Sequence, residues 1–145
     1  MNIVKSADQR RNEIISLLQS QKLPEEDLPL SLTDFYTALE GDELTGVIGM
    51  ERYGQYGLLR SMVVHPDYRN RHIAETLVKM LEEKAASSGI TSVFLLTETA
   101  ADYFRKKEYH TITRDEVPND VKQSSEFSHV CPVSAIVMKK QLTEI

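Results

Sequence analysis

Cysteine is almost missing from this chain, which has only Cys131 among its 145 residues. A single cysteine cannot form an internal disulfide or a cysteine metal cluster, and such scarcity is typical of proteins in the reducing cytosol. No apolar run approaches the roughly 18 residues of a membrane span, and no signal-peptide pattern is visible. We therefore expect a cytoplasmic protein that does not associate with membranes.

Positive charge is also in short supply, with 17 Lys and Arg against 22 Asp and Glu and a net charge of -5. This balance argues against a nucleic-acid-binding surface. The 4 histidines show no metal-ligand spacing, so no metal site is expected. Hydrophobic residues at 41% and charged residues at 27% are ordinary for a soluble globular protein. The length suits one compact domain over residues 1–145.

The most informative stretch is residues 58–89, where an apolar segment is followed by a polar loop and an amphipathic segment. Residues 58–64 are largely apolar and stop at His65-Pro66, which is typical of a strand buried on both faces. The amphipathic segment predicts a helix that ends near Gly89, because glycine commonly terminates helices. Its apolar positions recur at helical spacing and are Ile73, Ala74, Leu77, Val78, Leu81 and Ala85.

The loop between this strand and this helix is polar and basic, with Arg69 and Arg71 before the helix begins. The first amides of a helix have no partner inside the helix and lie at the positive end of its dipole. Next to two arginines, such amides are suited to binding a phosphate or a pyrophosphate. The stretch therefore predicts a strand, an anion-binding loop and a helix.

The flanking segments predict a mixed sheet with helices on both faces. A first helix is expected around Leu17, and shorter helical segments at residues 98–107 and 117–122. A right-handed crossover through the helix after Arg71 would set residues 93–97 parallel to residues 58–64. Further strands are expected at residues 1–5, 34–40, 44–51, 110–114 and 135–140.

Residues 63–74 carry a resemblance to a known family. The residues Val63-Val64-His65-Pro66, followed by Arg69-Asn70-Arg71-His72-Ile73-Ala74, resemble the acetyl-CoA-binding motif of the GNAT (Gcn5-related) N-acetyltransferases. In that motif a strand ending V-x-P precedes R/Q-x-x-G-x-G/A. Ala100, Tyr103 and Phe104 resemble the second cofactor-side segment of the same family.

The resemblance implies an α/β (α+β) GNAT fold with a mixed central sheet of about six to seven strands. It also implies acetyl-CoA as cofactor, with the pantetheine arm between the strands at residues 58–64 and 93–97. The residues that it implies for cofactor binding are Met62, Val63, Val64, Arg69, Asn70, Arg71, His72, Ile73, Ala74, Thr97, Ala100, Tyr103 and Phe104.

A finer resemblance concerns the C-terminal half. Leu95 to Ala100 (LLT-x-TA), residues 124–127 (S-x-E-F) and residues 131–138 (CP-x-SA-x-x-M) look like a GNAT subgroup encoded in arsenic-resistance operons. The resemblance suggests Cys131 and Ser134 as residues that line the site. It does not identify a substrate.

The chain also departs from the family pattern at four positions, and at the first of them Asn70 replaces the glycine that often follows the arginine. His72 replaces a central glycine, and Glu108 replaces another glycine. Phe104 stands where the family often has a tyrosine that protonates the departing thiolate. The replacements at His72, Phe104 and Glu108 are the basis of an alternative, in which the chain is a weakly active or inactive GNAT-fold module that binds CoA and acts as a sensor or interaction partner.

Candidates for acid-base chemistry are Glu51, Tyr103 and Cys131. Glu51 could accept a proton from the amine, although a solvated carboxylate at the end of a strand is the simpler interpretation. Tyr103 could replace the missing tyrosine, but a neighbouring helical position points about 100° away, which favours a packing role. Cys131 could be a nucleophile or an acid, although lone cysteines are more often small buried hydrophobes.

The expected function is acetyl-CoA-dependent transfer of an acetyl group to the amine of a small molecule. Holding the amine and the thioester in attack geometry can supply most of the rate, and the backbone of Met62 and Val64 is the expected support. The acceptor is expected to be an amino acid or an amino-acid-like toxin, and the chain a homodimer, as many soluble oligomers are.

Overall fold

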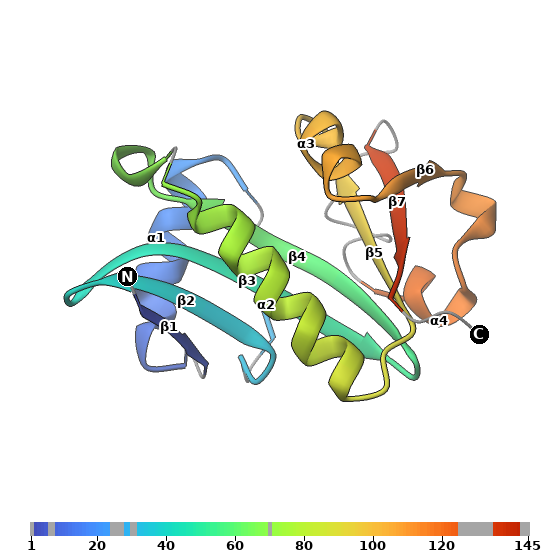
Figure 1. The fold of residues 1–145 in the computed structure, drawn as a ribbon, viewed down its shortest axis with the longest axis horizontal. Coiled ribbons are helices and arrows are strands. Elements are labelled where there is room, and N and C mark those ends of the chain that lie inside the picture. The colour runs from blue at the N-terminus through green and yellow to red at the C-terminus, as the bar shows by residue number, and fades with distance from the viewer. Residues whose placement is uncertain are drawn as a thin grey trace. The chain divides into compact units, whose positions relative to one another are not determined.

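The computed structural model describes residues 2–5, 8–23, 28–29, 32–69, 71–124 and 135–142 (Figure 1). The strands are β1 (Asn2–Lys5), β2 (Phe35–Glu40), β3 (Glu43–Tyr53), β4 (Tyr56–Val64), β5 (Ser92–Thr97), β6 (His110–Ile112) and β7 (Ile136–Gln141). The α-helices are α1 (Arg11–Ser20), α2 (Ile73–Ser87), α3 (Ala101–Lys106) and α4 (Asn119–Lys122). Single 3-10 turns lie at Asp8–Arg10, Pro66–Tyr68 and Arg114–Glu116.

The strands form one mixed sheet in the order β1-β2-β3-β4-β5-β7-β6. β4 and β5 are parallel, with Tyr56, Gly57 and Leu58 opposite Ser92, Val93 and Phe94. β1 with β2, β2 with β3, and β7 with both β5 and β6 pair antiparallel. The predicted mixed sheet and the parallel crossover through α2 are therefore confirmed. The place of β7 between β5 and β6 was not predicted, because sequence periodicity does not specify the order of strands.

The chain divides into two compact units. The first unit contains Met1–Met50 and Arg60–Lys84, and the second contains Glu51–Leu59 and Ala85–Ile145. The expectation of one domain over the whole chain stays a prediction.

The core of the first unit lies between α1 and the sheet. Its buried side chains are Ile14, Leu17, Leu18, Leu28, Leu32, Phe35, Leu44, Val47 and Val63. Neighbouring residues of a strand point to opposite faces, and Gly46 on β3 lies against Ile73 and Leu77 of α2 while Val47 joins the α1 core. α1 and α2 therefore cover opposite faces of this part of the sheet (Figure 1).

The second unit has its own apolar cluster, which comes from β4, β5, β7, α4 and the segment just before α4. Its buried members are Leu58, Phe94, Val117, Val121 and Val137. These side chains come from segments far apart in the sequence, so the cluster joins the C-terminal part of the chain to the start of β4.

Among the predicted elements that are shorter in the structure, α3 begins at a polar cap and β6 ends at one. α3 begins at Ala101 rather than residue 98, because the Thr97 hydroxyl accepts the amide of Ala100 at 2.9 Å. β6 ends at Ile112 rather than residue 114, because a capping box follows it. The Glu116 carboxylate accepts the amide of Thr113 at 3.0 Å, and this hydrogen bond lowers the pKa of Glu116.

The C-termini of α2 and α3 share one backbone motif with different residues. In α2, Gly89 has φ +94° and the amide of Ile90 donates to the carbonyl of Ala85. In α3, Glu108 has φ +73° and the amide of Tyr109 donates to the carbonyl of Phe104. Both are Schellman ends, which need a left-handed residue after the C-cap, and glycine adopts that backbone at no steric cost. Glu108 therefore carries strain that a glycine would not.

We expect Glu108→Gly to raise the free energy of unfolding by about 1 kcal/mol, because it removes the cost of a left-handed side chain. Urea denaturation followed by circular dichroism measures the change. Glu108→Ala is the control, because it removes the carboxylate but keeps Cβ and should give no gain. Equal stabilisation by both variants would assign the effect to charge and contradict the backbone explanation.

Candidate functional site

The junction between β4 and α2 places the predicted anion-binding loop within the first unit. The amide of His65 donates to the carbonyl of Thr45 at 2.8 Å, which fixes the end of β4 to β3. The chain then makes the 3-10 turn Pro66–Tyr68 and enters α2 at Ile73. Asn70, a predicted cofactor residue, lies outside the described residues. The strand, the short loop and the helix are thus arranged as the sequence predicted.

The two arginines of the loop have different surroundings. Arg69 donates through Nη2 to the side-chain oxygen of Gln21 at 2.7 Å, and through Nε to the carbonyl of Val64 at 3.4 Å. Arg71 instead lies over the ring of Tyr68, with its guanidinium carbon 5.0 Å from the ring centroid. Both arginine side chains are exposed. Arg69 is engaged through hydrogen bonds, whereas the contact that Arg71 makes among the described residues is with an aromatic ring, which uses few of its five N–H donors.

His72 has a left-handed backbone, with φ +61°. This conformation explains why glycine suits the position, because a residue with Cβ is strained there. The carbonyl of His72 accepts the amide of Thr76, which begins the hydrogen bonds of α2. Its exposed imidazole has Nδ1 3.2 Å from the carboxylate of Glu75. The ring is therefore already engaged by an acidic neighbour in the first turn of α2.

The predicted residues that flank this loop are partly core residues. Val63 and Ile73 are 6% and 3% exposed, while Met62, Val64 and Ala74 are half-buried. A functional contact of Val63 or Ile73 would have to use backbone groups, because their side chains pack in the interior.

Two features of β4 were not predicted. Ser61 has φ +56°, so a left-handed residue interrupts the strand in the middle of its apolar run. Arg60 is only 3% exposed, and its Nε lies 3.1 Å from the hydroxyl of Ser61. Arg60 is a charged residue inside an apolar run, and this position in the sequence could have indicated that its side chain is buried. Left-handed non-glycine residues concentrate at functional sites, and nothing in the identity of Ser61 indicates this backbone.

The remaining predicted cofactor residues belong to the second unit, around the start of α3. Thr97 caps the turn through its hydroxyl, and Ala100 is the N-cap residue of α3. Phe104 is 4% exposed and packs against Tyr109 at a centroid distance of 5.4 Å. Tyr103 packs edge-on against Phe104 at 5.2 Å, and its hydroxyl oxygen is buried.

The three candidates for acid-base chemistry lie in different surroundings. The half-buried carboxylate of Glu51 accepts the hydroxyl of Tyr53 at 2.5 Å, so it is not simply solvated. Tyr103 combines the expected packing role with a buried hydroxyl oxygen. Cys131 and Ser134 lie outside the described residues. The sequence did not predict the bond between Tyr53 and Glu51, although the spacing of two residues along a strand puts both side chains on one face.

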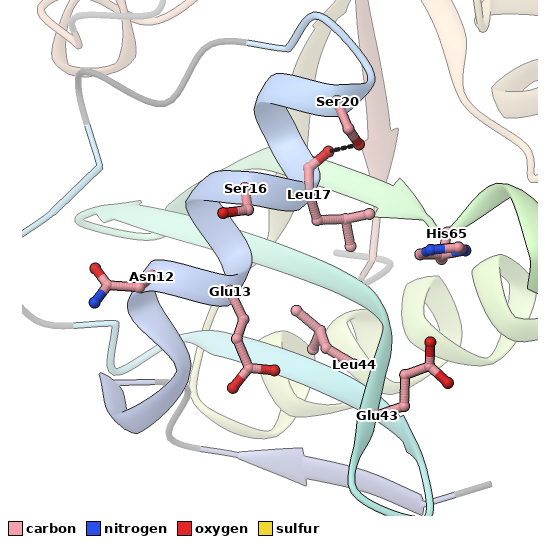
Figure 2. Close-up of a pocket in the computed structure, with 8 residues that line it drawn as sticks. All are labelled: Asn12, Glu13, Ser16, Leu17, Ser20, Glu43, Leu44 and His65. Carbon is pink, nitrogen blue, oxygen red and sulfur yellow. Dashed lines mark hydrogen bonds between the residues drawn. The ribbon is translucent and has the colours of Figure 1, made fainter.

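A pocket of about 490 Å³ lies in the first unit between α1, the start of β3 and the end of β4 (Figure 2). Its lining residues are Asn12, Glu13, Ser16, Leu17, Ser20, Glu43, Leu44 and His65. Both of its carboxylates are engaged within the protein. Glu13 pairs with Arg10 at 3.1 Å, and Glu43 accepts the hydroxyl of Tyr68 at 2.6 Å. One wall of the pocket is thus tied to the loop before α2.

The described residues contain no group of three or more His, Cys, Asp or Glu placed to hold a metal ion. Within the same part of the chain, no helix is both long enough and apolar enough to cross a membrane.

We expect Thr97→Val to lower the free energy of unfolding by about 1 kcal/mol, because the amide of Ala100 loses its acceptor. Thr97→Ser keeps an oxygen at the same place and should retain most of the stability. Thermal melts followed by circular dichroism measure both variants. If Thr97→Val is as stable as wild type, the hydrogen bond of the Thr97 hydroxyl does not contribute to stability and the explanation fails.

Part of the sequence is similar to that of amino-acid acetyltransferases. The chain is 30% identical over 67 residues to an amino-acid acetyltransferase of Escherichia coli (strain K12), a match that covers 46% of this chain and 15% of the relative. The chain therefore spans only a small part of the length of that relative.

Solved structures share the fold of the whole chain. N-acetylglutamate synthase from Neisseria gonorrhoeae, in complex with coenzyme A and N-acetyl-glutamate, superposes with a TM-score of 0.81 at 16% identity, over 99% of this chain and 35% of that one. An aminoglycoside 6'-N-acetyltransferase in complex with coenzyme A superposes with a TM-score of 0.74 at 19% identity, over 100% and 99% of the two chains.

A sequence model of the Acetyltransferase (GNAT) family matches residues 8–111, which include β2 to β5, α1 to α3 and the loop before α2. The match extends over most of the chain, and the mixed sheet has the fold that the solved structures share. The chain belongs to the GNAT acetyltransferase family.

Proposed function

We propose that this protein is an N-acetyltransferase that uses acetyl-CoA to acetylate the amine of a small molecule. The observation that carries the proposal is the junction of β4 and α2, in a chain of the GNAT family. A buried strand leads there through a loop with Arg69 and Arg71 into the start of a 15-residue helix.

The residues of the junction suit the pyrophosphate of CoA. The guanidinium of Arg71 lies over a ring that uses few of its donors, and the backbone amides of Ile73 and Ala74 lie in the first turn of α2. A left-handed residue at position 72 lets the chain turn sharply before these amides. In our proposal Arg71 and the helix amides bind the two phosphates, while Arg69 holds the loop against α1 through Gln21.

Acetylation of an amine requires a deprotonated amine, a polarised thioester carbonyl and a proton for the departing thiolate. Bound acetyl-CoA supplies the acetyl group as a reactive thioester. We propose backbone groups of Met62 and Val64 as the support for the reacting group, close to the left-handed Ser61. The support for this role is the resemblance to the family and the left-handed backbone of Ser61.

We propose Glu51 as the group that accepts the amine proton and Tyr103 as the group that returns a proton to the thiolate. The hydrogen bond from Tyr53 fixes the orientation of the Glu51 carboxylate, which supports the first role. The buried hydroxyl oxygen of Tyr103 supports the second. Cys131 stays a further candidate on sequence grounds.

An amino acid or an amino-acid-like compound is the acceptor class that we favour. The support is the name of the Escherichia coli relative, an amino-acid acetyltransferase, and the N-acetyl-glutamate in the complex of the Neisseria gonorrhoeae enzyme. Membership of the arsenic-resistance subgroup is a separate proposal, which rests on residues 95–100 and on two motifs at residues 124–138. A cytoplasmic location and a homodimer are proposals of the same kind, and light scattering would test the dimer.

A second candidate function is a GNAT-fold module that binds CoA but does not turn it over. Phe104 favours this function, because it fills the position where the family often has a proton-donating tyrosine and it has no hydroxyl. The two candidates differ in one measurable property, which is the release of free thiol in the presence of an amine.

We expect purified protein to bind acetyl-CoA and CoA with micromolar dissociation constants, on the order of -8 kcal/mol, in titration calorimetry. Incubation with acetyl-CoA and a panel of amino acids and other amines should release thiol with at least one acceptor. CoA binding without thiol release from any amine would favour the sensor module. No binding of either compound would contradict both functions.

We expect His72→Gly to raise the free energy of unfolding by about 1 kcal/mol, because the left-handed backbone then carries no Cβ. It should also tighten CoA binding if the imidazole crowds the phosphates. His72→Ala is the control, because it removes the ring but keeps the backbone strain. Calorimetry on both variants separates the two effects, and unchanged or weaker CoA binding would reject crowding.

A further inference from the structure

The hydroxyl of Tyr68 connects the loop before α2 to a strand that lies far from it in the sequence. This hydroxyl donates to the Glu43 carboxylate at 2.6 Å, and Glu43 is the first residue of β3. The hydrogen bond to Glu43 is the main reason that the pKa of Tyr68 is raised. The phenol therefore stays protonated at neutral pH and remains a donor to the carboxylate. A charge-assisted bond of this length is one of the stronger contacts available to a partly exposed side chain.

The ring of Tyr68 is fixed on a second side by His65. The two rings meet edge-on with centroids 5.7 Å apart. His65 is itself held, because its Nδ1 accepts the amide of Asp67 at 3.1 Å. Glu43 and His65 stand on the same side of the pocket in Figure 2. The phenol is thus held at its hydroxyl and along its edge.

The guanidinium of Arg71 lies over the face of this ring, 5.0 Å from its centroid. That distance is within the range of a cation–π contact, and donation from the phenol to a carboxylate makes the ring richer in electrons. In the described segments Arg71 forms no ion pair with a carboxylate, so the ring is what orients its long side chain. Arg69 differs, because Gln21 and the carbonyl of Val64 hold it through hydrogen bonds.

We propose that Tyr68, braced by Glu43, is a positioning residue that holds the Arg71 guanidinium in place to bind the pyrophosphate of CoA. The proposal rests on the proposed function and goes beyond it. It names Arg71 as the arginine that binds the anion, and Tyr68 and Glu43 as the residues that position its side chain. Fixing a flexible side chain before binding removes an ordering cost that would otherwise weaken the complex. Arg71 is the arginine that contacts the anion, and Arg69 is the one that holds the loop.

Variants of Tyr68 and Glu43 separate the contribution of the aromatic ring from that of the hydrogen bond to Glu43. Tyr68→Leu removes the ring and should weaken CoA binding about 3- to 10-fold, the usual range for the ordering of one long side chain. Tyr68→Phe and Glu43→Gln keep the ring and should have smaller effects, about 2-fold. Glu13→Gln is the matched control, because Glu13 lines the same pocket but pairs with Arg10, and it should leave the affinity unchanged.

A double-mutant cycle tests whether Tyr68 acts through Arg71. Titration calorimetry with CoA is carried out on wild type, Tyr68→Leu, Arg71→Ala and the double variant. The loss caused by Tyr68→Leu should be about 3- to 10-fold in wild type and should fall below about 2-fold when Arg71 is already alanine. An equal loss in both backgrounds would assign Tyr68 a merely structural role and would overturn the proposal.

A second measurement does not depend on CoA. Ring-current shifts of the Arg71 side-chain protons in NMR should be present in wild type and in Tyr68→Phe, and they should be lost in Tyr68→Leu. Their absence in wild type would overturn the contact itself. If wild type shows the shifts but does not bind CoA, the proposed function fails and the positioning role for CoA fails with it. If wild type binds CoA but the cycle is additive, the positioning role alone fails.

Discussion

The packing of α2 against β3 is the constraint on which the junction depends. A Cβ added to Gly46 would lie 3.1 Å from Ile73 and 3.2 Å from Leu77, so even a methyl group would press on the first two turns of the helix. This close approach fixes where α2 begins, because Ile73 is its first residue. The amides at the start of α2, and the loop that leads to them, are therefore positioned by an apolar contact between α2 and β3.

The protein uses left-handed backbone at positions where glycine would be easier. Lys22 ends α1, His72 begins α2 and Glu108 ends α3, each with φ between 60° and 73°. At Lys22 and Glu108 the surrounding hydrogen bonds are those of a helix end, so the geometry of the helix end accounts for the left-handed backbone there. His72 stands next to the proposed anion site, and there the same left-handed backbone coincides with a departure from the family pattern.

The sequence predicted β4, the basic loop and α2, because burial and amphipathicity have a local period that one segment displays by itself. It did not predict that β7 lies between β5 and β6, because strand order depends on contacts between distant segments. For the same reason the sequence did not predict the hydrogen bond between Glu43 and Tyr68, which are 25 residues apart. The arginines could be named from a motif, but their different partners could not, since Gln21 is 48 residues from Arg69.

The net charge of -5 makes short-range contacts decisive at this loop. A polyanion gains nothing from the overall field of an acidic protein, and salt screens that field beyond about 8 Å at physiological ionic strength. Attraction must therefore come from groups that touch the ligand, such as the helix amides and the guanidinium of Arg71 in our proposal. Two acidic residues near the loop, Glu43 and Glu75, are engaged by Tyr68 and His72. A neutral phenol that donates a hydrogen bond leaves the Glu43 carboxylate charged, so the contacts of Arg71 and of the helix amides with phosphate have to outweigh the repulsion between this carboxylate and the anion.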